Sequence, residues 1–328
     1  MSKKGSRKEF LFHIMLKENP QLLKQLWDVD YQHDNLEKPV QDGYMDMNGL
    51  DQQSGLPVMI ESQLNQSDDN HFKKVKRLID ETNEGIIAWF APSFRTEHIS
   101  ALSKLVHFQT IKPIKLYFVE LNDSFLDELT HLNQLTDMAF WERLSAGLVV
   151  LPELSVVGCA STMPDHYQAR DDHSIWVPDN PTISTYYKNQ YFMRRLSKRM
   201  PYFLNVHRYK KLKSNQLNFG TGRTSIRLAF SLVNRMEQPY IEFSITNPKQ
   251  YEKAMFEQVL NDVASQRLKQ TNWSVDHRIL MYYTFSDDFS SIVEELIDQF
   301  EWLYSIYEPI LNHQESQPII KEEQVSLF

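Results

Sequence analysis

The run Gly43-Tyr44-Met45-Asp46-Met47, followed by a polar connection and then by Pro57-Val58-Met59-Ile60-Glu61-Ser62-Gln63-Leu64, places one acid inside each of two apolar stretches. The connection is rich in Asn, Gly and Ser, which predicts a hairpin joining two adjacent strands. Residues two apart in a strand share a face, so Glu61 and Gln63 point the same way, and Asp46 can face them. Carboxylates brought this close repel each other, and a divalent cation is the usual reason for such a pair.

The composition is that of an ordinary soluble protein, with 328 residues, 41% of them hydrophobic and 24% charged. This length allows two domains, at roughly 150 residues for each. No apolar run approaches the roughly 20 residues of a membrane span, and no signal-peptide core follows the first residues. We therefore expect a cytoplasmic protein without a membrane partner. The single Cys159 excludes an internal disulfide and a multi-cysteine zinc site.

The net charge of −8 hides a strongly asymmetric distribution. No acidic residue occurs from Asn180 to Met236, and twelve Lys and Arg lie in that window, so the rest of the chain carries −20. Such a field indicates a polyanion, and we expect DNA to bind there through its phosphates without base specificity. The alternative is a solvated charged surface. The expected DNA contacts are Lys188, Arg194, Arg195, Lys198, Arg199, Arg208, Lys210, Lys211 and Arg223.

Hydrophobic periodicity predicts an α/β (α+β) fold with a mixed central sheet flanked by helices, and then a second α+β domain. In the first half we expect helices at 7–18, 21–26, 69–84 and 96–108, and strands at 27–32, 43–47, 57–64, 86–90 and 114–121. Beyond it we expect helices at 123–144, 186–200, 249–266 and 290–310, and strands at 148–157, 216–219, 225–233, 240–246 and 277–285.

The two acids and this order of elements, αβββαβ and then αβ, resemble the PD-(D/E)xK nuclease superfamily. Its signature is an Asp on one strand and an acid-x-Lys triplet on the next. Here Asp46 and Glu61-Ser62-Gln63 stand in those places, with Gln63 where Lys is usual. The N-terminal half is also distantly similar to archaeal and actinobacterial mismatch endonucleases.

The resemblance extends over nearly the whole chain to largely uncharacterised prokaryotic proteins that pair a nuclease-like half with a C-terminal domain of unknown function. It implies a nuclease-like domain at 1-122, a connecting helix and loop-rich joint at 123-182, a basic α+β domain at 183-312 and a flexible tail at 313-328. The positions that carry it are Glu9, Asn19-Pro20, Ile60 to Leu64, Asp68, His71, Phe219-Gly220 to Arg223, Arg235, Trp273 and Arg278.

The superfamily resemblance implies a DNA endonuclease in which Asp46 and Glu61 hold Mg²⁺ (or Mn²⁺) and the ion activates a water for attack on phosphorus. Glu9 is the expected outer ligand, and Gln63 orients a water without supplying the charge of a lysine. The missing cation, or a phosphate contact, is expected from Lys73, Lys74 and His71 on the following helix. The alternatives are a structural role for Glu61, an exposed Glu9 and a capping His71.

The last five residues, Gln324-Val325-Ser326-Leu327-Phe328, are similar to the bacterial sliding-clamp-binding peptide, whose usual form is Gln-Leu-Ser/Asp-Leu-Phe. Leu327 and Phe328 are the expected apolar anchors in the clamp, and Gln324 can hydrogen-bond at the rim of its groove. The alternative is a tail that folds back onto its own domain.

Together these features predict a nucleoid-associated DNA endonuclease that the sliding clamp recruits, in DNA repair at the replication fork or in defence against foreign DNA. The alternative is a catalytically inactive nuclease-fold protein that binds DNA or the clamp as a regulatory module. A third hypothesis is a restriction-type enzyme with a defined recognition sequence. The resemblance also allows a homodimer.

Overall fold

The computed structural model describes residues 7–40, 43–108, 112–164, 167, 185–221, 225–232, 238–246, 253–254, 256–257, 260–261, 271–274, 277–283 and 289–313. The chain divides into two compact units. The first consists of Met1–Asp179 with His207–Tyr209, and the second of Asn180–Val206 with Lys210–Phe328.

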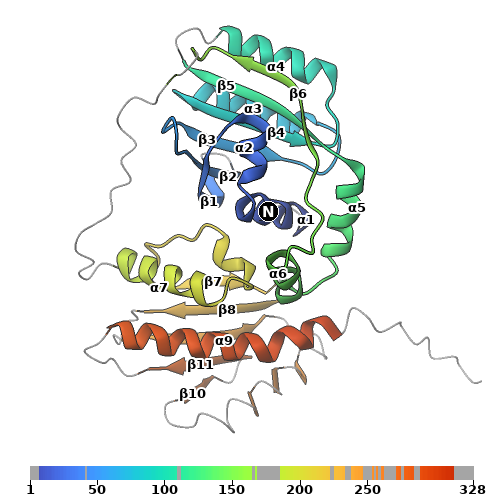
Figure 1. Cartoon of the computed structure of the whole chain (residues 1–328). Helices are drawn as coiled ribbons and strands as arrows, with labels where there is room; N and C mark the ends of the chain where they lie inside the picture. Colours follow the sequence, from blue (N-terminus) through green and yellow to red (C-terminus); the bar gives the residue numbers. More distant parts are fainter. Residues whose placement is uncertain are drawn as a thin grey trace, which may run out of the picture. The chain divides into compact units, whose positions relative to one another are not determined.

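The first unit contains a six-stranded mixed sheet in the order β1-β2-β3-β4-β5-β6 (Figure 1). The first three strands form an antiparallel meander, β3, β4 and β5 are parallel, and β6 returns antiparallel to β5. The strands are β1 (Tyr31–Val40), β2 (Gly43–Asp51), β3 (Pro57–Ser62), β4 (Gly85–Ala91), β5 (Ile114–Leu121) and β6 (Leu154–Ser161).

Helices pack on both faces of this sheet, because β4 is buried along its whole length and offers apolar side chains to each side. On one face, Trp89 joins a cluster with residues of α3 and α4. On the other, Phe90 packs edge-on against Phe12 of α1, with ring centroids 5.7 Å apart. The helices of this unit are α1 (Arg7–Glu18), α2 (Gln21–Trp27), α3 (Asp69–Glu81), α4 (Thr96–Phe108), α5 (Asp123–Leu132) and α6 (Asp137–Ser145).

The predicted element order up to residue 121 is confirmed, with several shifted ends. The first strand begins at Tyr31 rather than at residue 27, because α2 runs to Trp27 and Asp28 ends it with a left-handed φ of 58°. The predicted helix at 123–144 is two helices, α5 and α6, and the extended segment after it begins at Leu154.

Residues 123–164, which were expected to belong to a joint, are grouped with the first unit instead. The reason is β6, which pairs with β5 from Lys115 to Leu121 and so satisfies the backbone groups of an otherwise open sheet edge. A Pro-rich sequence gives no sign of this long-range pairing.

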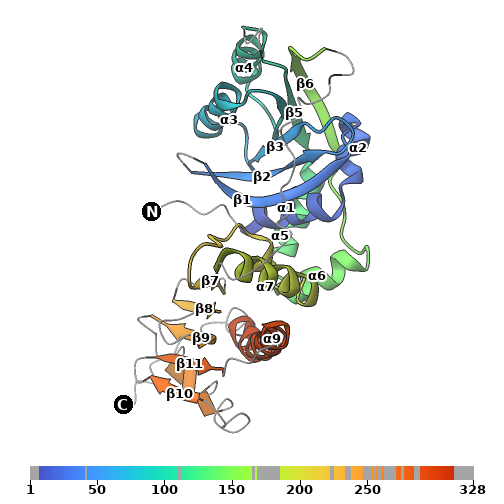
Figure 2. The ribbon, with the colours of Figure 1, turned by 90° about the vertical axis from the view of Figure 1, so that its left-hand side faces the viewer.

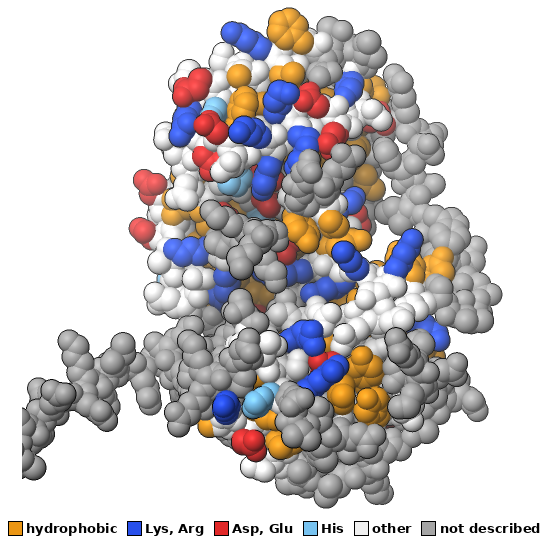
Figure 3. Space-filling model, turned by 180° about the vertical axis from the view of Figure 1, so that it is seen from behind, with side chains coloured by type: hydrophobic (Ala, Val, Ile, Leu, Met, Phe, Trp, Pro, Cys, Tyr) orange, Lys and Arg blue, Asp and Glu red, His pale blue; other side chains and the backbone are white. Residues whose placement is uncertain are grey.

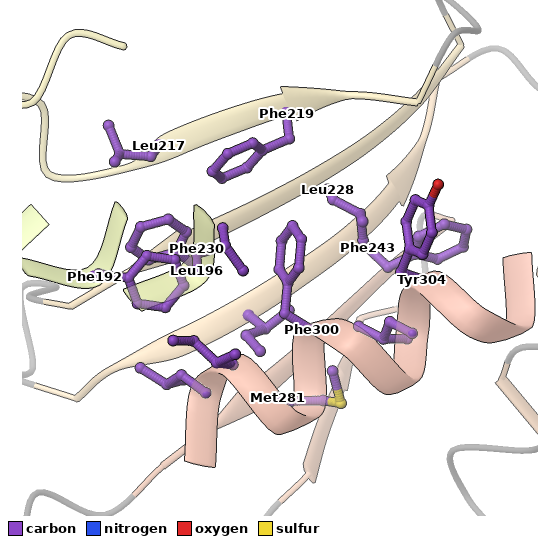
Figure 4. Close-up of a cluster of buried hydrophobic side chains, with 14 of the residues drawn as sticks. Phe192, Leu196, Leu217, Phe219, Leu228, Phe230, Phe243, Met281, Phe300 and Tyr304 are labelled. Atoms are coloured by element: carbon purple, nitrogen blue, oxygen red, sulfur yellow. The ribbon is translucent and has the colours of Figure 1, made fainter. Parts of the chain in front are cut away.

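The second unit contains an antiparallel sheet of five strands in the order β10-β11-β9-β8-β7. Residues of α7 and α9 pack on one face, and Figure 4 shows Phe192 of α7, Phe243 of β9 and Phe300 of α9 in this core. The predicted helix at 249–266 lies largely outside the described residues, and β10 was not predicted. The elements are α7 (Thr185–Arg199), the 3₁₀ helix η1 (Leu204–His207), β7 (Leu217–Gly220), β8 (Ile226–Ser231), β9 (Tyr240–Ile245), β10 (Thr271–Ser274), β11 (Arg278–Tyr282) and α9 (Phe289–His313).

Among the residues that the structure describes, no helix combines the length and the apolar character that crossing a membrane requires.

Gly49 is required where β1 and β2 approach each other. A Cβ at this position would lie 2.1 Å from the backbone oxygen of Gln32 and 2.6 Å from Cε2 of Tyr31. We therefore expect Gly49→Ala to destabilise the first unit by about 2–3 kcal/mol, measured by chemical denaturation. Gly220→Ala is the control, because the nearest atom to its Cβ would be Asn205 Oδ1 at 3.9 Å. Equal stability of the two variants would contradict this account.

Candidate active site

Asp46 lies on β2 directly beyond the last residue pair between β2 and β3, Met47 with Ile60. Its Oδ2 accepts hydrogen bonds from the Ser62 backbone N–H at 2.8 Å and from Ser62 Oγ at 3.2 Å. Both bonds are possible because the two strands stop pairing here, which leaves the backbone of β3 available to a side chain. One carboxylate oxygen of Asp46 is therefore fixed by β3.

His13 of α1 extends this arrangement and was not singled out by the sequence analysis. Its Nε2 contacts Ser62 Oγ and lies 3.9 Å from Asp46 Oδ2. Burial lowers the pKa of His13, although the Asp46 carboxylate opposes the shift, so we treat the imidazole as neutral. His13 could have been identified from the sequence as a histidine one helical turn after Glu9, inside the helical run that the structure buries.

Glu61 lies on β3 next to Ile60 and is 1% exposed. Lys74 Nζ of α3 forms an ion pair with its Oε1, and His71 Nε2 lies 3.8 Å from the same oxygen. Burial and the nearby Asp46 carboxylate raise the pKa of Glu61 well above its usual value, and Lys74 opposes this shift. The site therefore holds a buried acid whose charge is costly.

Lys74 of α3 places a cation beside Glu61. Burial disfavours the charged form of Lys74, but the Glu61 and Asp46 carboxylates outweigh it and raise the pKa of Lys74. The ammonium group therefore stays charged beside Glu61. The neighbouring Lys73 is exposed, and no contact joins it to Glu61 among the described residues.

The N-terminus of α3 orients His71. Asp68 is the N-cap, and its Oδ1 accepts hydrogen bonds from the backbone N–H groups of Asn70 and His71. The same carboxylate lies 3.1 Å from His71 Nδ1. Burial disfavours the Asp68 carboxylate, but its bonds with His71 outweigh this and lower the pKa of Asp68. His71 thus takes part in the helix cap while its Nε2 approaches Glu61.

Gln63 is buried, and its amide nitrogen is committed to the loop after β3. Nε2 donates to the backbone oxygen of Asn65 at 3.0 Å and also to that of Gln66. Its Oε1 is buried and has no partner in the described part of the chain. In the side chain of Gln63, only the amide oxygen Oε1 is therefore available to a water or an ion.

Glu9 completes the acidic group from the first turn of α1. It is partly buried, and its carboxylate acts on the pKa of His13, Glu61 and Lys74 in the same direction as Asp46 does. The structure thus brings together side chains from α1, β2, β3 and α3.

The donor set suits Mg²⁺ better than zinc. In the described residues no three His, Cys, Asp or Glu side chains are arranged to hold a metal ion by themselves. Mg²⁺ is usually bound by one or two carboxylates, several waters and substrate phosphates. Asp46 and Glu61 can supply the carboxylates, and the unpartnered Oε1 of Gln63 can accept a bond from a water.

The acid-free window does not produce an acid-free surface on α7. Arg195 lies 2.5 Å from Glu294, and Arg199 lies 2.9 Å from Asp298 and 3.1 Å from Glu301. These acids come from α9, far away in sequence. Two of the expected DNA contacts are therefore already ion-paired within the unit.

The other expected contacts lie in different settings. Arg194, Lys198 and Lys211 are exposed. Lys188 Nζ lies 6.0 Å from the ring centroid of Phe289, and Lys210 Nζ donates to the backbone oxygen of Asn218 at 3.2 Å. Arg223 and the tail residues Gln324, Val325, Ser326, Leu327 and Phe328 lie outside the described residues.

Arg208 belongs to the first unit, although the basic run that contains it continues into the second. It forms a parallel bridge with Leu36 of β1, and the Tyr209 N–H donates to the Leu36 backbone oxygen at 2.9 Å. Its guanidinium lies 3.5 Å from Glu37 and 4.0 Å above the ring centroid of Phe10. Arg208 is thus grouped with the first unit, whereas the arginines of α7 belong to the second.

Comparison with known proteins gives two structural neighbours. No protein-family model matches the chain, and no curated protein matches it. A repair endonuclease from Pyrococcus abyssi is 23% identical, with a TM-score of 0.27 over 37% of this chain and 49% of that chain. The EndoMS–dsDNA2 complex is 20% identical, with a TM-score of 0.25 over 32% of this chain and 43% of that chain. The chain thus spans less than half the length of either neighbour.

The raised pKa of Glu61 predicts a pH-dependent stability difference. When the pKa of an acid is higher in the folded than in the unfolded protein, the protonated acid stabilises the fold at pH values below the unfolded pKa. That stabilisation is lost as the pH rises through the folded pKa. Glu61→Gln removes this loss, so we expect it to melt at a higher temperature than the parent protein above neutral pH. The difference should shrink as the pH falls toward 4.5, the usual value for Glu.

Thermal melts across this pH range would test the effect, with the exposed Glu81→Gln on α3 as the control. A Glu61→Gln protein that is less stable than the parent at pH 8 would show that Glu61 is a well-paired structural acid.

Proposed function

We propose that this chain is a divalent-cation-dependent DNA endonuclease of the PD-(D/E)xK type, with Asp46 and Glu61 as its Mg²⁺ or Mn²⁺ ligands. The observation that supports this most strongly is the buried Glu61 on the strand beside Asp46, where the Asp46 carboxylate disfavours the charge of Glu61. A protein gains no stability from such an arrangement, and perturbed acids of this kind concentrate at functional sites.

Each surrounding group has a role in this proposal. The bound ion would lower the pKa of a water for attack on phosphorus and offset charge on the leaving oxygen. Lys74 keeps a positive charge beside Glu61 and would take over the role of the superfamily's lysine. His71 is held by Asp68 with its Nε2 toward the same carboxylate. Glu9 adds negative charge that favours a cation.

The protein without the clamp would bind DNA weakly and without sequence specificity. We therefore also propose that the sliding clamp recruits it through Gln324-Val325-Ser326-Leu327-Phe328. Attachment to the clamp raises the effective concentration of the enzyme on DNA without a new DNA contact. DNA repair at the fork or defence against foreign DNA would both suit an enzyme recruited in this way. Homodimers are compatible with this scheme.

The competing candidate is an inactive nuclease-fold protein that binds DNA or the clamp. Gln63 favours it, because a glutamine carries no charge with which to help deprotonate a water. This candidate predicts no cleavage with Mg²⁺ or Mn²⁺ and no functional loss in Asp46→Ala. A restriction-type enzyme would instead give discrete fragments.

Cleavage of plasmid, mismatched and forked DNA with each metal tests the endonuclease proposal. Asp46→Ala and Glu61→Ala should each lower the rate by at least about a hundredfold, because the ion supplies several kcal/mol of transition-state stabilisation. Lys74→Met should also lose activity. Lys73→Met is the matched control and should retain activity, because it removes the same charge one residue away from the contact with Glu61.

Calorimetric titration of Mn²⁺ separates binding from chemistry. The parent protein should bind the ion, whereas Asp46→Ala and Glu61→Ala should bind it at least about tenfold more weakly. Cleavage that persists in both alanine variants would rule out this site. Metal binding without any cleavage would favour the inactive alternative.

Removal of residues 324–328 tests the recruitment proposal. The shortened protein should lose binding to the bacterial clamp in a pull-down with purified components, because Leu327 and Phe328 are the expected anchors. Its rate on DNA without clamp should be unchanged. A Leu327→Ala, Phe328→Ala protein that still binds the clamp would refute this assignment.

A further inference from the structure

The sheet of the second unit has one face that packs against helices and one face of different character. Alternate residues of β8, β9 and β11, such as Leu228, Phe243 and Ile279, enter the core with α7 and α9. Figure 2 shows both helices on the same side of these strands. The intervening residues therefore form the opposite face, which no described helix covers.

Two arginines lie in one row across this opposite face. Arg227 of β8 and Arg278 of β11 both pair with Ser244 of β9, one on each side. Next to this row, Glu242 is fully buried, and the Nη2 atoms of the two arginines each lie 2.6 Å from one of its carboxylate oxygens. Three strands thus fix two guanidinium groups close together.

Among the described residues, the row keeps a net positive charge and N–H groups that Glu242 does not use. Burial disfavours the Glu242 carboxylate, but the bonds from Arg278 and Arg227 outweigh it and lower the pKa of Glu242. Two cations therefore share one anion. The side chains of Arg227 and Arg278 are 46% and 43% exposed. Each arginine binds Glu242 through Nη2, so its other N–H groups remain for an outside acceptor.

Two aromatic side chains occupy the same face further along the strands. Tyr240 of β9 pairs with Tyr282 of β11, and their ring centroids lie 5.7 Å apart. Both are partly exposed. In the view opposite to that of Figure 1, Figure 3 shows Lys and Arg side chains around an acidic one, beside hydrophobic side chains, in the lower part of the molecule.

The residue of β7 next to Arg227 is a glycine. Gly220 of β7 pairs with Arg227, and a Cβ on this glycine would meet nothing closer than 3.9 Å. Packing therefore does not require a glycine at this position. A glycine here places no side chain next to Arg227.

We infer that this face of β8, β9 and β11 binds single-stranded DNA. A phosphate would bind the donors of Arg227 and Arg278, whose planar forks match phosphate oxygens. Unpaired bases would stack on Tyr240 and Tyr282, which the bases inside a duplex cannot do. This surface lies on the face of the sheet opposite to α7, it shares no residue with the proposed nuclease site, and its binding needs no cleavage.

Fluorescence anisotropy with a labelled oligo-dT, measured in EDTA so that metal-dependent cleavage cannot interfere, tests the inference on the full chain. Tyr240→Leu with Tyr282→Leu should weaken binding at least about tenfold. Replacing Arg227, Glu242 and Arg278 together by Leu removes the whole ionic group without leaving a buried charge unpaired. This variant should weaken binding and reduce the salt slope by about 1, since roughly 0.7 is expected for each phosphate contact to a single strand.

Two further variants keep the test decisive if the triple variant folds poorly. Gly220→Asp adds a negative charge beside Arg227 without touching the Glu242 pairs, and should weaken binding several-fold. Lys76→Leu with Asp80→Leu removes an exposed ion pair on α3 and should leave affinity unchanged. Full affinity in Gly220→Asp and in the tyrosine variant would overturn the inference. A hairpin duplex bound as tightly as oligo-dT would overturn the assignment to single strands.

Discussion

The site in the first unit is organised around a buried carboxylate, that of Glu61. Glu61 is almost fully buried, Lys74 forms an ion pair with it, and Asp46 lies near enough to disfavour its charge. The free-energy cost of removing an acid from water usually exceeds the stabilisation that a single ion pair contributes. The arrangement therefore stores an electrostatic cost at one point of the sheet, which a bound cation would relieve.

The rest of the unit holds that point in place. Divergence of β2 and β3 after Met47 and Ile60 frees the backbone of Ser62 to bind Asp46, and α1 supports Ser62 through His13. Because Asp68 begins α3, that helix aims His71 and Lys74 at Glu61. Large aromatic side chains on both faces of β4 fix the layers that carry these helices. The acids are thus held by rigid elements rather than by loops.

Charge in the second unit is arranged by tertiary contacts rather than by its sequence order. The acids of α9 neutralise Arg195 and Arg199 on α7, which were the most evident cations of the basic run. Arg227 and Arg278, which lie far apart in sequence, meet at Glu242 instead. Arg195 and Arg199 on the helix are thus paired with acids, whereas on the sheet face two arginines share one carboxylate among the described residues. On the sheet face, the aromatic pair Tyr240 and Tyr282 accompanies the two arginines.

The sequence by itself determined the order of elements through β5 and the two strands that carry Asp46 and Glu61, because periodicity and turn composition are local properties. It indicated an extended segment at 148–157 but not that this strand, β6, pairs with β5 and completes the first sheet, because that pairing joins residues far apart in the chain. Nor could it reveal that His13 supports Ser62 or that Arg208 lies on Phe10. Such contacts join residues distant in the chain, and only the folded backbone brings them within bonding distance.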